Sequence, residues 1–114
     1  MRLFIAIEEA LDGSLAGAKE HLEQAVVRQD NVYDQQIVAI TKALVAFQEL
    51  SPDQRRKGFA DIRKQLNARF PSGALSKSSP DIQRTFKRAG RAFGKAGAGW
   101  RARLWFRLRI LGIG

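Results

Sequence analysis

Residues 79–95 read SPDIQRTFKRAGRAFGK, and this stretch decides the fold class. Ser79, Pro80 and Asp81 form a helix start signal, with an N-cap hydroxyl, a proline at the first helical position and an acid in the first turn. On a wheel of about 100° per residue, three apolar side chains lie within about 40° of Ile82. They are Phe86, Ala89 and Phe93. The stretch is therefore predicted to form an amphipathic helix whose apolar face packs on a core.

The opposite face of this predicted helix is basic. Its cations lie between about 140° and 240° from Ile82 on the same wheel. They are Arg84, Lys87, Arg88, Arg91 and Lys95. Five positive charges opposite an apolar face predict a helix that presents cations to solvent or to an anionic partner.

Three more helices are predicted upstream. The clearest start is SPDQ at residues 51–54, which supplies a serine N-cap, a proline at the first helical position and a capping-box glutamine. Apolar residues at helical spacing follow it as far as Phe70. Similar spacing predicts helices from Ser14 to about residue 29 and from Asn31 to about residue 50. Residues 2–11 are ambiguous, because their apolar run fits either a buried strand or the first turns of a helix.

The C-terminal segment has a different period. Gly97 and Gly99 fall in a glycine-rich stretch, 96–99, that is predicted to be a flexible hinge. Apolar and basic residues then alternate from Trp100 to Leu111, which is the two-residue period of a strand. We expect a strand or extended arm here, paired either with residues 3–7 or with a second copy of the chain.

Together these patterns predict a mainly α protein. Three to four amphipathic helices form the core, and a basic C-terminal strand or arm follows, with room for a minor two-stranded sheet involving the N-terminus. The expected organisation is a helical domain at residues 1–95, acidic over 1–50 and basic over 51–95, then the hinge at 96–99 and the arm at 100–114. A homodimer through the C-terminal strand is the alternative way to pair that edge.

The charge of the chain is divided between its two halves. The 114 residues carry a net charge of +9. Residues 1–50 hold four basic and eight acidic residues, whereas residues 51–114 hold 16 basic and three acidic ones. Because the first half cannot neutralise the excess of the second, the sequence predicts a basic surface for an anionic partner.

Several kinds of site are excluded by residue content. The chain has no cysteine, so disulfides, thiolate metal sites and cysteine nucleophiles are excluded. It has one histidine, His21, which excludes a multi-histidine metal site within one chain. No set of acid, base and nucleophile can be assembled with any specificity, so we expect neither enzymatic activity nor a cofactor. The N-terminal apolar run is too short for a signal peptide and no stretch is long enough for a membrane span, which favours a cytoplasmic protein.

The predicted binding residues lie in the C-terminal third, where arginines alternate with aromatic residues. They comprise the five cations of residues 84–95 together with Arg101, Arg103, Trp105, Arg107 and Arg109. Arginine forks to phosphates and tryptophan stacks on bases, so the leading hypothesis is a non-enzymatic protein that binds nucleic acid. An acidic protein surface would need the same charges, as expected for a small regulator or inhibitor of mobile-element type. An anionic membrane is the third hypothesis.

Overall fold

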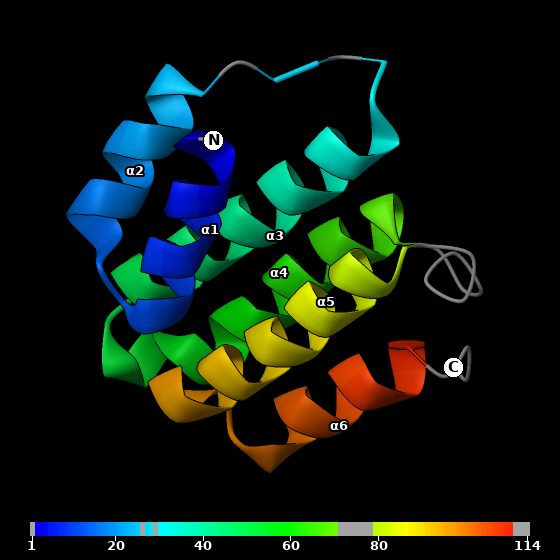
Figure 1. Ribbon diagram of the computed structural model, residues 1–114. Helices are drawn as coiled ribbons and strands as arrows, with labels where there is room; N and C mark the ends of the chain where they lie inside the picture. The colour runs from blue at the N-terminus through cyan, green and yellow to red at the C-terminus, as the bar shows by residue number, and fades with distance from the viewer. Residues whose placement is uncertain (1, 26, 29, 71–78, 111–114) are drawn as a thin grey trace.

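The computed structural model describes residues 2–25, 27–28, 30–70 and 79–110, and within these ranges the regular elements are all helical (Figure 1). The elements are α1 (Arg2–Asp12), α2 (Leu15–Gln24), α3 (Val32–Glu49), the 3₁₀ turn η1 (Pro52–Gln54), α4 (Arg55–Arg69), α5 (Pro80–Phe93), the π-helical turn η3 (Gly94–Ala98) and α6 (Trp100–Ile110). The prediction of a mainly helical protein is confirmed.

The N-terminal segment is a helix and not a strand. Leu3, Ala6, Ile7 and Ala10 are buried, which is the spacing of one helix face. The other side of α1 leaves Phe4 exposed. The predicted two-stranded sheet is therefore wrong, since its N-terminal strand does not exist.

Residues 100–110 also form a helix, so the predicted C-terminal strand is wrong. Ala102 and Phe106, four residues apart, are buried on the side that meets α5. Residues 100–109 contain no β-branched residue, and Arg, Leu and Ala are good helix formers. A helix satisfies its own backbone groups, whereas a strand here would need an edge that α1 does not offer. The hinge and the homodimer stay predictions, as does the division into domains; residues 111–114 lie outside the described part.

The helix caps agree with the sequence in part. The Ser79 hydroxyl accepts a hydrogen bond from the Ile82 amide at 3.3 Å, and the Asn31 side chain accepts one from the Asp34 amide at 3.0 Å. Ser51 makes no side-chain cap bond, because η1 intervenes before α4 begins at Arg55. The helix expected to reach about residue 29 ends at Gln24.

The core is an aromatic cluster where α3, α4, α5 and α6 meet. Phe93 of α5 lies 5.1 Å from Phe47 of α3, 5.5 Å from Phe59 of α4 and 5.3 Å from Phe106 of α6, measured between ring centroids. Phe86 lies two helical turns earlier on α5, and its ring centroid is 4.6 Å from that of Phe106. Such pairs add specific geometry to a large apolar burial. The apolar face predicted for residues 79–95 thus forms the centre of the fold.

The helices form a flat layer about 19 Å thick and 33 Å across. α2 and α1 lie at one end, α3 and α5 in the middle, and α6 at the opposite end (Figure 1). α4 packs on α3, and α6 packs on α5. α1 and α2, which carry five of the acidic residues, therefore lie at one end of the molecule, and α6 with its four arginines lies at the other (Figure 1).

Candidate anion-binding site

The cations predicted on α5 divide into paired and unpaired groups. Arg84 forms an ion pair with Asp81 one turn earlier. Arg88 donates two hydrogen bonds to the Glu8 carboxylate of α1, each at 2.7 Å. The remaining residues of the predicted basic face, Lys87, Arg91 and Lys95, are exposed and form no ion pair within residues 2–70 and 79–110.

The Arg88–Glu8 pair makes one part of the fold sensitive to acid. The hydrogen bonds from Arg88 lower the pKa of Glu8, whereas partial burial opposes that shift. A lowered folded-state pKa gives stability that is present above the unfolded value of about 4.3 and is lost as pH falls through the folded value. We expect Glu8→Gln to lower the free energy of unfolding at pH 7 by at most about 1 kcal/mol, because both side chains are exposed.

The difference between the wild type and Glu8→Gln should shrink towards zero as the pH is lowered below about 4. Urea unfolding of both proteins at several pH values measures it. Lys42→Ala is the control, since Lys42 is exposed and forms no ion pair in the described part of the chain, so its effect should not change with pH in this range. A difference for Glu8→Gln that stays constant down to pH 2 would contradict the pairing of Glu8 with Arg88.

The four arginines predicted as binding residues of the C-terminal strand or arm all lie on α6, where they do not share one environment. Arg101, Arg103 and Arg107 are exposed. Arg109 is only 8% exposed; its guanidinium donates to the Asn67 side chain of α4 and lies 5.2 Å from the Trp105 ring centroid. Its Nε has no hydrogen-bond partner within the described ranges. Arg109 therefore joins α6 to α4 and is not part of the open basic surface.

Trp105 is partly buried against the core. Its ring centroid lies 4.9 Å from that of Phe106 and 6.1 Å from that of Phe86, so it extends the aromatic cluster of the core. The exposed tryptophan of α6 is instead Trp100, at 68%. Of the two aromatic side chains, Trp100 is thus the one available to a partner.

A small basic depression with a volume of about 20 Å³ lies between α5 and α6, and we call it the groove. Lys87 and Arg91 line it from α5, and Arg103 and Arg107 line it from α6, with Gly90 and Phe106 at its floor. The two helices can approach closely here because residue 90 is a glycine. A Cβ at this position would lie 2.8 Å from the Phe106 Cβ, a distance that real side chains do not tolerate. The structure therefore gathers four of the predicted binding residues, from two helices, around one depression.

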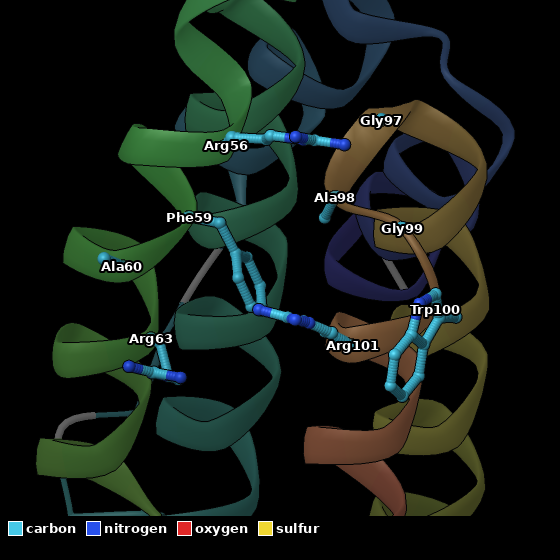
Figure 2. A pocket seen from close by; sticks show the side chains of 9 residues that line it. All are labelled: Arg56, Phe59, Ala60, Arg63, Gly97, Ala98, Gly99, Trp100 and Arg101. Carbon is cyan, nitrogen blue, oxygen red and sulfur yellow. The ribbon is translucent and has the colours of Figure 1, made fainter.

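A larger pocket of about 490 Å³ opens between α4, η3 and α6 (Figure 2). Arg56 and Arg63 reach it from α4, and Arg101 reaches it from α6. Figure 2 shows Phe59 and Trp100 on opposite sides of the same space. None of the three arginines forms an ion pair with an acid in the part of the chain that the structure describes.

The backbone between α5 and α6 shapes this pocket. Gly97 and Gly99 line it and have φ values of 118° and 81°, in the region that favours glycine. Arg55 holds the turn in place, donating to the carbonyl of Ala96 at 2.6 Å and to those of Gln48 and Leu50 at 3.2 Å. The glycine stretch is thus a defined turn tied to the end of α3 and the start of α4.

Sequence reasoning missed the contribution of α4 to this site. The missed residues are Arg55, Arg56, Phe59 and Arg63. The spacing of Arg56, Phe59 and Arg63 puts them on one helix face and was visible in the sequence. What the sequence did not show is that α6 folds back alongside that face.

Metal chemistry has no evident place at this surface. Across residues 2–70 and 79–110, apart from 26 and 29, no group of three or more His, Cys, Asp or Glu side chains comes together as a metal site would need. His21 lies with Nδ1 2.5 Å from Glu9 Oε1, at the acidic end of the molecule. The basic surface of α4, α5 and α6 is the candidate site, and its exposed guanidinium groups are of the type that pairs with carboxylates and phosphates.

Comparison with known proteins gives no further guide. No protein-family model, curated protein or solved structure shows a significant match to the chain. In the described part of the structure, no helix combines the length and apolar character needed to cross a bilayer.

Proposed function

We propose that the chain is a non-enzymatic protein that binds nucleic acid through the basic surface of α4, α5 and α6. One observation carries this proposal. Seven cations without an acid partner in the described ranges line a groove and a pocket, and both features share α6. They are Lys87, Arg91, Arg103 and Arg107 in the groove, and Arg56, Arg63 and Arg101 in the pocket. Cations that no internal acid neutralises suit a polymer of phosphates.

The residue types at this surface favour nucleic acid over the two alternatives. Six of the seven cations are arginines, whose planar forks match phosphate oxygens. Trp100 offers an exposed ring beside them, and such rings stack on bases. A membrane binder would need a broad apolar face, whereas the large apolar side chains exposed on α6 are Trp100 and Leu104.

Equilibrium binding to labelled oligonucleotides tests the proposal. We expect the protein to bind both RNA and DNA at 50–100 mM salt, with log affinity falling linearly as log salt rises. Purified protein should carry nucleic acid that absorbs at 260 nm and that high salt removes. Absence of measurable affinity at 50 mM salt would overturn the proposal, because even non-specific phosphate binding persists there.

The alternative functions predict different outcomes in parallel assays. A regulator of an acidic protein would retain its partner from a nuclease-treated lysate and show no affinity for the oligonucleotides. A membrane binder would sediment with vesicles of anionic phospholipid, and its tryptophan emission would shift to the blue. Either pattern, without oligonucleotide binding, contradicts the nucleic-acid proposal.

A further inference from the structure

The pocket between α4, η3 and α6 combines two kinds of recognition that the groove lacks. It is lined by arginines from two helices and, on the side opposite α4, by an exposed aromatic ring (Figure 2). Its volume of about 490 Å³ falls within the range of small-molecule sites, which is about 300–1,000 Å³. The groove between α5 and α6 is lined by cations without an exposed ring.

The ring in question is not explained by packing. Trp100 is the first residue of α6 and is 68% exposed, so its ring does not contribute to the core. The Arg101 guanidinium carbon lies 5.8 Å from the Trp100 ring centroid, which is within the range of a cation–π contact. A cation held near an open ring places positive charge next to a surface on which a base can stack.

The pocket is also held in shape before any ligand arrives. Arg55 bonds to the Ala96 carbonyl of η3 and to two carbonyls at the end of α3, and Gly97 and Gly99 have backbone angles that other residues rarely adopt. A Cβ on Gly99 would meet nothing within 4 Å, so a glycine is needed there for its backbone angle and not for lack of space. Backbone hydrogen bonds that are already formed in the free protein lower the entropy lost when a flexible ligand binds.

We infer that this pocket takes one unpaired nucleotide of single-stranded nucleic acid, with the base against Trp100 and the flanking phosphates on Arg56, Arg63 and Arg101; this rests on the proposed function. In a duplex, bases are stacked on one another and do not offer a free face to Trp100. Electrostatic contacts with the groove act on either form. The pocket is therefore the element that makes single strands the preferred ligand.

The first experiment compares a 12-residue oligothymidylate with a 12-base-pair duplex. We expect Trp100→Ala to weaken binding of the oligothymidylate about 5- to 150-fold, which is the range for loss of one stacked base. Its affinity for the duplex should change by less than twofold. Trp100→Phe keeps an aromatic ring and should restore most of the lost affinity. Leu104→Ala, the matched control, removes the other exposed apolar side chain of α6 and should change neither affinity.

The second experiment tests the phosphate contacts on α4. Arg56→Ala/Arg63→Ala should weaken oligothymidylate binding about 25-fold at 0.1 M salt, from two contacts at a slope of about 0.7 each on a single strand. Lys57→Ala/Lys64→Ala is a matched control, because each lysine follows one of those arginines on the same helix, is exposed and does not line the pocket. Equal losses from the two double variants would overturn the assignment.

The outcomes separate this inference from the proposed function. If neither oligonucleotide binds, the proposed function fails. If both bind and Trp100→Ala weakens them equally or not at all, the function stands and the pocket assignment fails. Thymidine monophosphate serves as the probe for a free nucleotide. If it binds as tightly as the oligothymidylate, the pocket is a mononucleotide site and the single-strand assignment is overturned.

Discussion

Phe106→Ala is expected to lower the free energy of unfolding by about 3–5 kcal/mol, the range for removing a buried phenylalanine. Phe106 is 1% exposed and is surrounded by rings from two other helices, with centroids at 4.6 Å for Phe86, 5.3 Å for Phe93 and 6.4 Å for Phe59. The loss is a large fraction of the total stability of a small domain, which is about 5–15 kcal/mol. Urea unfolding followed by circular dichroism measures it.

Leu104→Ala provides the control on the same helix. Leu104 is 43% exposed, so its replacement should change the unfolding free energy by no more than about 0.5 kcal/mol. A loss below about 1 kcal/mol for Phe106→Ala would mean that α6 does not pack on α5 as the structure shows. The groove between these helices would then have no fixed geometry, because Phe106 lies at its floor.

The sequence predicted those elements whose signals are local. The helix from Pro80 follows from a serine cap and an apolar stripe, both contained within 15 residues, and the structure contains both. The segment 100–110 was misjudged because alternation of apolar and basic residues has the period of a strand. Its true partner is the surface of α5 at Gly90, where only a glycine lets Phe106 approach. That fit depends on tertiary packing, which periodicity does not contain.

The candidate site was predictable in its charge but not in its arrangement. The excess of arginine after residue 80 indicated a basic surface, and the structure places four of those cations in one groove. Arg88 and Glu8 lie 80 positions apart in the chain, so no local sequence pattern shows that the Arg88 guanidinium is paired with a carboxylate. Arg109 stood in the same alternation as the exposed arginines, yet the contact with Asn67 of α4 removes it from the surface.

The same packing step explains why the pocket was not foreseen. Arg56, Phe59 and Arg63 lie on one face of α4, and Arg101 lies about 40 residues later in the chain. They face one space only because the chain turns at Gly97 and Gly99 and because Arg55 fixes that turn. An extended arm would have presented its arginines as one continuous basic strip. Because residues 100–110 form a helix, the exposed arginines are divided between the groove and the pocket.

Replacing cations of the groove is expected to weaken duplex binding strongly. Replacing Arg91 and Arg107 with alanine removes two phosphate contacts, one from each wall. For duplex DNA, each phosphate contact raises the logarithm of the binding constant by about 0.9 when the salt concentration is lowered tenfold. Taking 1 M salt as the reference, the double variant should bind about 60-fold more weakly at 0.1 M salt and about 3- to 4-fold more weakly at 0.5 M. Fluorescence anisotropy with a labelled duplex measures both values.

The change in this ratio with salt distinguishes direct contacts from a loss of folding, which would weaken binding at every salt concentration. Lys19→Ala/Lys42→Ala is the matched control, because it lowers the net charge by the same amount on α2 and α3, away from the groove. At 0.1 M salt the Debye length is about 10 Å, so these distant charges should alter affinity by less than about 3-fold. Equal losses for the two double variants would show that net charge alone attracts the duplex, and that Arg91 and Arg107 do not contact its phosphates.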